Sequence, residues 1–282
     1  MTNRLELNWS LDGIVDEQRY YCSETPIDSE NLPVPKAVLA ENIRAYTDFA
    51  ITEGATYYMH IGSVKNAVEK LSDEIKVYAF NSNLFKINSD FESNLIDKTS
   101  KVWTANGNAN VSDGRLNLDG TDDYLTTPAS DDYHFNNSED VTIRFKVKIN
   151  SFKASNIATV FSTYLINAGN QNYCVRILNN SIAIVMWTAQ SPTWTYSIPL
   201  GIEKEISIER ESMIWRLYVD GVQIGSTFTQ TSNYAKSIMT SYIGSGIYEG
   251  YGSERDLNGT LRKFQIIIGL AVGGGQSTTP RI

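Results

Sequence analysis

The sequence predicts an all-β protein that consists of two antiparallel β-sandwich domains. Short runs in which apolar and polar residues alternate recur along the chain, and Gly, Pro, Asp or Asn residues separate them. This pattern is typical of strands and of the turns between them. The runs LELNWSL, QRYYCSE and ATYYMHIGSV all lie before residue 65. Strands at this density indicate a small sandwich, and the many short runs after it indicate a second, larger one.

Turn chemistry supports the assignment of strands in the second part of the chain. The strings ILNNSIAIV and YVDGVQIG each place polar turn residues between two apolar runs. Asp220-Gly221 suits a two-residue type I′ turn, because both central positions of that turn have positive φ. We therefore expect β-hairpins at both strings.

The domain boundaries follow from where the alternation changes. We expect a first domain over residues 1–82, a second over 88–272, and a junction between Ala79 and Asp90 that is short because it contains no Pro-rich or Gly/Ser-rich spacer. The end of the chain, 273–282, has the composition of a flexible tail. The stretch PKAVLAENIRAYTDF also fits an amphipathic helix, but the strand patterns on both sides of it favour strands.

Composition excludes several classes of function. The chain has 282 residues, 41% of them hydrophobic and 20% charged, with no apolar run of membrane-spanning length and no signal-peptide pattern at its start. The net charge is −8 and neither domain has a basic stripe, so we expect no nucleic-acid partner and no membrane partner. The two cysteines, Cys22 and Cys174, fall in different predicted domains, so we expect no disulfide.

Common catalytic signatures are missing from the sequence. His60 and His134 are the two histidines, and we expect structural roles for both. Retaining glycosidases of jelly-roll fold carry an acidic-x-Asp-x-Glu string on one strand. Here ISIERES offers only Glu209 and Glu211 on one face, flanked by charged residues, which indicates a solvated strand. We therefore expect that the protein is not an enzyme.

The first domain resembles a fibronectin type III module. Trp9 falls on a second strand, Tyr20 and Tyr21 on a third, and Tyr57 stands in YTDFAITEGATYYMHIGSV where that family has its corner tyrosine. Such a tyrosine packs its ring in the core and bonds its hydroxyl to the backbone of the preceding corner.

The second domain resembles laminin-G-like, concanavalin A-like jelly rolls over roughly residues 90–271. LNLDGTDDYLTTPAS is similar to the front hairpin of that family, SEDVTIRFKVKINS to its long first sheet strand, and IWRLYVDGVQIGST to its late hairpin. SYIGSG and LNGTLRKFQIIIG are similar to its closing strands. Together, the resemblances of the two domains imply an immunoglobulin/fibronectin III-like sandwich followed by a concanavalin A-like jelly roll.

Calcium is frequent in this superfamily, and the chain has carboxylates that suit it. The candidates are Asp90, Glu92, Asp97, Asp119, Asp122 and Asp123. Many members supply an acidic residue in the closing strand, but Arg262 stands at that position here. We therefore expect no metal or other cofactor, and we interpret Asp122 and Asp123 as turn formers.

Aromatic residues in loops are the candidates for ligand contact, because a sugar ring stacks its C–H face on an aromatic ring while polar groups bind its hydroxyls. Two segments, WTAQSPTWTYSIP and GSGIYEGYGSERDLNG, contain this mixture. The predicted glycan-binding residues are Trp194, Tyr248, Tyr251, Asp256 and Asn258.

The two resemblances together imply a protein of a phage or prophage virion, since tailed phages use both module types and make virion proteins in the host cytoplasm for release by lysis. We expect a tail-associated structural protein in a homo-oligomer or symmetric array with other virion proteins, its jelly roll facing outward to bind host surface glycans. Two alternatives remain open. One is an architectural or decoration protein of the virion without a glycan site, and the other is a bacterial surface adhesin or carbohydrate-binding module.

Overall fold

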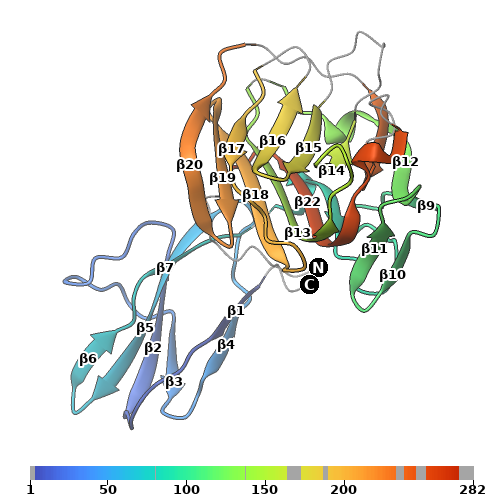
Figure 1. The fold of residues 1–282 in the computed structure, drawn as a ribbon. Helices are drawn as coiled ribbons and strands as arrows, with labels where there is room; N and C mark the ends of the chain where they lie inside the picture. Colours follow the sequence, from blue (N-terminus) through green and yellow to red (C-terminus); the bar gives the residue numbers. More distant parts are fainter. Residues whose placement is uncertain are drawn as a thin grey trace. The chain divides into compact units, whose positions relative to one another are not determined.

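The computed structural model describes residues 4–79, 81–136, 138–163, 173–186, 190–232, 238–245 and 252–272. The chain divides into two compact units, of which the first extends to Ser82 and the second begins at Asn83. Nearly all regular structure in the described residues is antiparallel β-strand (Figure 1). The helical segments among them are single 3-10 turns, η1 (Ser82–Leu84), η2 (Asp131–Tyr133) and η4 (Gly252–Arg255). The predicted all-β fold is confirmed.

Unit 1 contains a two-stranded and a five-stranded sheet. Strands β1 (Leu5–Asn8) and β4 (Ala45–Asp48) form the smaller sheet. The larger sheet has the order β3-β2-β5-β6, with β7 also paired to β5. Its strands are β2 (Glu17–Ser23), β3 (Ala37–Ala40), β5 (Thr56–Lys65), β6 (Val68–Leu71) and β7 (Ile75–Tyr78). Because β3 and β4 occupy the stretch that also fits a helix, the strand interpretation of that stretch is correct.

The core of unit 1 is small, and one tyrosine ties its corner. Tyr20, Met59 and Ile61 form the buried cluster, against which half-buried residues of β1 pack. The ring of Tyr57 is buried, and its hydroxyl accepts a hydrogen bond of 2.9 Å from the backbone N–H of Thr52. The expected corner bond of Tyr57 is therefore confirmed.

Unit 2 contains two larger sheets. The eight-stranded sheet has the order β10-β11-β22-β13-β18-β19-β20, with β8 also paired to β22, and the seven-stranded sheet has the order β17-β16-β15-β14-β21-β12-β9. The first sheet comprises β8 (Phe85–Ser89), β10 (Asn110–Ser112), β11 (Arg115–Asp119), β13 (Val141–Ser151), β18 (Lys204–Glu211), β19 (Ile214–Val219), β20 (Val222–Thr229) and β22 (Asn258–Ile268). The second comprises β9 (Thr104–Asn106), β12 (Tyr124–Ser130), β14 (Ile157–Ser162), β15 (Tyr173–Leu178), β16 (Ser181–Met186), β17 (Thr193–Thr195) and β21 (Met239–Ile243).

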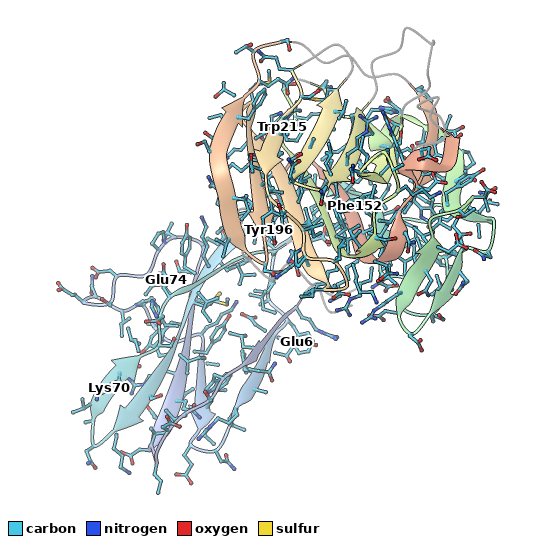
Figure 2. All side chains as sticks on the ribbon, in the orientation of Figure 1. Glu6, Lys70, Glu74, Phe152, Tyr196 and Trp215 are labelled. Carbon is cyan, nitrogen blue, oxygen red and sulfur yellow. The ribbon has the colours of Figure 1, made fainter. Side chains whose placement is uncertain are left out.

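Strand β13 lies between β22 and β18 in the eight-stranded sheet, and its buried and outward-facing residues alternate. Its apolar side chains are fully buried and point to the core: Val141, Ile143, Phe145, Val147 and Ile149. The residues between them face outward, because successive side chains of a strand point to opposite faces. Trp215 on β19 lies in the same core, between the strands of unit 2 (Figure 2). One apolar core therefore holds both sheets together.

The two hairpins predicted from turn chemistry are present. Strands β15 and β16 pair with Leu178 opposite Ser181, and β19 and β20 pair with Val219 opposite Val222. The φ values of Asp220 and Gly221 are +48° and +81°. These are the positive values that a type I′ turn requires, so the predicted turn is confirmed.

The segment LNLDGTDDYLTTPAS differs from its prediction. Strands β11 and β12 do not pair with each other, because β11 pairs with β10 and β22 while β12 pairs with β9 and β21. The turn between them therefore crosses from one sheet to the other. Gly120 has a φ of +80°, and a Cβ there would lie 2.8 Å from the Cβ of Asn258. The close approach of β22 thus requires glycine at this crossing.

Candidate functional site

Trp194 is the one predicted glycan-binding aromatic residue among the described residues, and its ring is not exposed. It lies on β17 between two exposed threonines, its side chain points into the sandwich, and only 4% of its surface is exposed. Its indole N–H donates a 3.1 Å hydrogen bond to the carbonyl oxygen of Ser226 on β20. The prediction of an exposed stacking surface at Trp194 is therefore wrong, because the alternation of β17 turns the ring inward.

Asp256 and Asn258 lie two residues apart but have different environments. Asp256 is 2% exposed and accepts a 2.9 Å hydrogen bond from the hydroxyl of Ser245. Asn258 begins β22 and is half-buried, and its amide donates to the hydroxyl of Ser151 at 3.1 Å. Asn258 therefore reaches the protein surface, whereas Asp256 is an interior residue. Tyr248 and Tyr251 lie outside the described residues.

Asn258 belongs to a polar face that the sequence analysis did not identify. On the outer side of the eight-stranded sheet, Asn110, Asn117, Thr260 and Lys148 form one row across β10, β11, β22 and β13. The adjacent row contains Asp119 and Asn258. Asn150 near the end of β13 is exposed, and its amide lies 3.4 Å from Oδ1 of Asn258. We call this surface, defined by Asn110, Asn117, Asn150, Asn258 and Thr260, the polar face.

The polar face can form hydrogen bonds in both directions. A side-chain amide has two N–H donors and a carbonyl that accepts, which matches the hydroxyls of a sugar. The amide nitrogen of Asn117 donates to the hydroxyl of Ser112 at 3.0 Å, while its carbonyl oxygen accepts no hydrogen bond from the described residues. The carbonyl oxygen of Asn117 therefore remains available as an acceptor near the exposed Asn110 and Asn150, whereas Thr260 is buried.

Charged side chains continue the same face in the next row. Lys146 on β13 lies opposite Arg262 on β22 and opposite Glu205 on β18. Arg144 and Lys146 both pair with Glu205. Burial raises the pKa of Glu205, but the hydrogen bond and the charge of Arg144, with those of Lys146, lower it by more, so its pKa lies below its ordinary value. This carboxylate is therefore ionised at neutral pH.

Four of the candidate calcium ligands already accept hydrogen bonds from backbone N–H groups, namely Asp90, Asp97, Asp119 and Asp123. Both carboxylate oxygens of Asp123 are occupied, one by the N–H of Asn108 at 2.7 Å and the other by the N–H of Asp119 at 2.8 Å. Asp97 accepts from the N–H groups of Asn88 and Thr99. In the described part of the chain no group of three or more potential metal-binding side chains occurs. These contacts give Asp97 and Asp123 structural roles, and Asp123 acts at the turn as expected.

Two other titratable residues, His60 and Glu209, are buried by the fold. His60 is 7% exposed, and its Nδ1 lies 2.8 Å from the carbonyl oxygen of Ser72. Glu209 is buried, which corrects the expectation of a solvated strand. It lies opposite Thr142, whose hydroxyl bonds to both Leu270 and Val272. The segment after β22 therefore passes over this part of the sheet and covers it.

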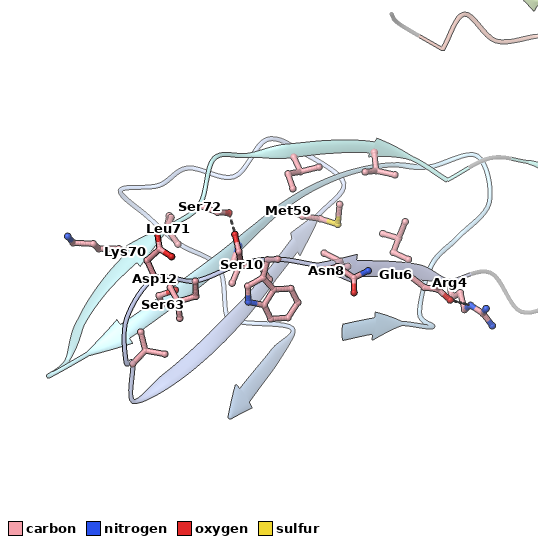
Figure 3. Close-up of a pocket in the computed structure, with 18 of the residues that line it drawn as sticks. Arg4, Glu6, Asn8, Ser10, Asp12, Met59, Ser63, Lys70, Leu71 and Ser72 are labelled. Carbon is pink, nitrogen blue, oxygen red and sulfur yellow. Dashed lines mark hydrogen bonds and ion pairs between the residues drawn. The ribbon is translucent and has the colours of Figure 1, made fainter. Parts of the chain in front are cut away.

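Unit 1 contains a groove with a volume of about 1020 Å³ (Figure 3). One wall is β1, and the opposite wall comes from β5, β6 and β7. Its apolar lining includes Leu7, Met59 and Val77, and the polar residue Ser72 is already bonded to the N–H of Ile61. The polar groups of this groove do not form a row like that of the polar face, so we do not place the glycan site here.

Several solved structures resemble this chain. The binding domain of botulinum neurotoxin serotype D/C matches with a TM-score of 0.53 and 15% identity, over 66% of this chain and 49% of its own. The binding domain of paraclostridial mosquitocidal protein 1 matches with a TM-score of 0.53 and 12% identity, over 68% and 50%. Domain 4 of a GH43 extracellular arabinanase from Geobacillus stearothermophilus, in complex with arabinotriose, matches with a TM-score of 0.51 and 15% identity, over 66% and 93%.

These similarities are of fold. The matched region spans about half the length of the toxin binding domains and nearly all of the arabinanase domain. No protein-family model matches the sequence, and no curated protein matches it either. Among the described residues no helix is long and apolar enough to cross a membrane. Over about two thirds of its length the chain shares the β-sandwich fold of these domains.

Proposed function

We propose that this protein is a glycan-binding module and that the polar face of unit 2 forms its site. The observation that carries the proposal is the row of amide and hydroxyl side chains on neighbouring strands, with Asn258 in the adjacent row. Strands in a sheet lie about 4.8 Å apart, so side chains in one row can reach successive hydroxyls of an oligosaccharide.

The fold similarity supports the same function. The arabinanase domain was solved with arabinotriose, and cell entry of botulinum neurotoxin type C depends on interaction with two ganglioside molecules. Function resides in sites rather than in folds, so the amide row carries more weight than the likeness. The role of Tyr248 and Tyr251 as stacking residues beside this site remains a prediction.

A glycan array tests the proposal with wild-type protein and the variants Asn258→Ala and Asn150→Ala. Each substitution removes hydrogen bonds to sugar hydroxyls, and we expect each to weaken binding several-fold, since one such bond contributes about 1 kcal/mol. Asn42→Ala, an exposed asparagine of unit 1, is the matched control. Binding that survives both substitutions unchanged, with all proteins folded, contradicts the location of the site.

Within this class, we infer a role as a tail-associated structural protein of a phage or prophage virion. The support is the combination of a small sandwich that has a tyrosine corner, as fibronectin type III modules do, with a jelly-roll sandwich. Both Cys22 and Cys174 are free thiols, which suits synthesis in the host cytoplasm. The partners would then be other virion proteins in a symmetric array, which would strengthen weak glycan binding through avidity.

Labelling of intact particles tests this finer role. An antibody raised against the chain should decorate purified phage particles at the tail, and the protein should be recovered from them by mass spectrometry. Recovery from bacterial envelopes rather than particles would instead favour a surface adhesin. Particle labelling without any glycan binding would favour the architectural role.

A further inference from the structure

Strand β1 of unit 1 has one edge with which no described strand pairs. Its sheet contains β1 and β4 alone. The backbone N–H of Trp9 donates to the carbonyl oxygen of Arg44 at 3.1 Å, so Trp9 directs its backbone groups toward the partner strand. Because successive residues of an antiparallel strand direct these groups to opposite sides, Glu6 and Asn8 direct theirs away from β4. Both residues line the groove of unit 1 (Figure 3), so the open edge of β1 borders this groove.

The apolar face across the groove from this edge is only partly covered. Strand β4 lies over β2, where the ring centroids of Tyr46 and Tyr20 are 5.2 Å apart. Ile75 on β7 lies opposite Met59 on β5, so both side chains point to the same face of the sheet. Met59 is buried, whereas Ile75 is 53% exposed and Val68 on β6 is 63% exposed. Ile75 and Val68 line the groove, so its floor has apolar side chains with no described strand over them.

The charges along the groove balance one another. The charged side chains that line it are Arg4, Glu6, Asp12, Lys65 and Lys70. Arg4 forms an ion pair with Glu6 at 2.8 Å, and Lys65 forms one with Asp16 at 2.8 Å. The remaining two, Asp12 and Lys70, have opposite signs. Charge complementarity therefore favours an occupant without net charge, and the floor favours an apolar one.

We propose that this groove binds an extended, uncharged segment of another protein, which adds as a strand to the open edge of β1. The segment pairs its backbone with Glu6 and Asn8. Its side chains alternate in direction, so every second one contacts the floor at Val68 and Ile75. A small apolar molecule would cover the floor but leave the edge of β1 unpaired. This inference concerns unit 1 and is independent of the glycan site proposed on unit 2.

A displayed library of random peptides of about eight residues, slightly longer than an average strand, tests the proposal by selection on the full-length protein. We expect the enriched peptides to have apolar residues at alternate positions and no net charge. Synthetic forms of them should protect the amides of Glu6 and Asn8 from hydrogen exchange, because the new ladder uses both N–H groups. Failure to enrich any peptide, or binding without protection of these amides, overturns the proposal.

Asn8→Pro tests the backbone pairing. Proline has no N–H and its ring blocks the open edge, while the hydrogen bonds to β4 remain. Thr47→Pro is the matched control, since Thr47 lies opposite Glu6 and directs its backbone away from β1. We expect Asn8→Pro to weaken peptide binding about tenfold or more and Thr47→Pro to leave it unchanged, with the folding of both checked by calorimetry. Binding that Asn8→Pro does not weaken overturns strand addition.

Ile75→Ser tests the floor and does not depend on a backbone change. Its side chain is half exposed, so unit 1 should stay folded, and binding of the selected peptides should weaken several-fold. Val34→Ser is the matched control, because Val34 is 89% exposed and lies outside the groove. Unchanged binding by Ile75→Ser overturns the assignment to this groove.

Sedimentation of the protein alone distinguishes a second copy of the chain from another protein. We expect wild type and Asn8→Pro to have the same assembly state, because the open edge awaits a different chain. An assembly that Asn8→Pro dissociates would place a second copy in the groove and overturn the proposed partner.

Discussion

The guanidinium of Arg262 on β22 binds both carboxylate oxygens of Glu203, with its Nε 3.0 and 2.9 Å from Oε1 and Oε2. Arg262 stands at the position where many laminin-G-like jelly rolls, which the second domain resembles, have an acidic residue. A cation at that position meets a carboxylate from the segment before β18, so the closing strand is tied to that segment by an ion pair.

Calcium should have no effect on the stability of the protein, because Asp97 and Asp123 bind backbone N–H groups and Arg262 brings positive charge to the closing strand. We expect the thermal midpoint of unit 2 to stay the same after chelation with EDTA and after addition of about 10 mM calcium, which exceeds the dissociation constants of even weak calcium modules, about 10⁻⁴ to 10⁻³ M. Differential scanning calorimetry measures this. A midpoint that falls with EDTA and returns with calcium contradicts the prediction.

Tyr57→Phe should destabilise unit 1 by about 1 kcal/mol, because it leaves the N–H of Thr52 without the hydroxyl that it binds at 2.9 Å. Urea unfolding followed by fluorescence measures the change. Tyr58→Phe is the control, because the hydroxyl of this half-buried neighbour forms no hydrogen bond with the described residues. Equal effects of the two substitutions would show that the corner bond contributes nothing.

Asp123→Ala should cost unit 2 about 2 kcal/mol or more, since the buried carboxylate accepts two backbone N–H groups at the crossing between the sheets. Thermal and urea unfolding both measure this loss. Asp12→Ala, which removes an exposed carboxylate in unit 1, provides the control. A stable Asp123→Ala protein would mean that the turn at Gly120 forms without this carboxylate.

Acid should remove the stabilisation that Glu205 contributes. The folded-state pKa of Glu205 is below its ordinary value of 4.5, because the hydrogen bonds and charges of Arg144 and Lys146 outweigh the effect of burial. Its contribution is thus fully present above pH 4.5 and is lost as the pH falls through the lower, folded-state pKa. We expect Glu205→Gln to make the thermal midpoint of unit 2 less dependent on pH between 5 and 3, while Glu92→Gln, at an exposed position, leaves it unchanged.

Reducing agent should leave both thermal transitions unchanged. Cys22 is half-buried in unit 1 and Cys174 is buried in unit 2, and both are free. Calorimetry with and without dithiothreitol measures the two midpoints. A fall in either midpoint on reduction would reveal an intermolecular disulfide that stabilises the protein.

Local patterns were enough to predict the strands and turns of this protein. The alternation in VTIRFKVKINS predicts β13 and its buried face, because side chains on a strand alternate whatever its partners are. The residue types at Asp220-Gly221 predict the turn, because positive φ is a local property. Tyr57 is predictable for a similar reason, since its hydrogen bond spans only five residues.

Properties that depend on which strands become neighbours were not predictable in this way. The sequence predicts a hairpin at β11 and β12, yet β11 pairs with β22 and β12 pairs with β21, both distant in the sequence. The sequence predicts that Trp194 is a loop residue, but the structure places it on β17, where its indole N–H bonds to β20. One row on the outer face of the eight-stranded sheet brings together Lys146, Glu205 and Arg262 from three separate parts of the chain.

The sequence by itself thus determined the all-β class, the two-sandwich organisation and the inward or outward direction of side chains in long strands, because these depend on residue type and on a period of two. Tertiary structure alone decided the order of strands in each sheet, the burial of Trp194 and Glu209, and the meeting of amides with cations on one face. The reason is physical: sheet pairing joins residues more than a hundred positions apart, and no local preference encodes which strand lies beside another.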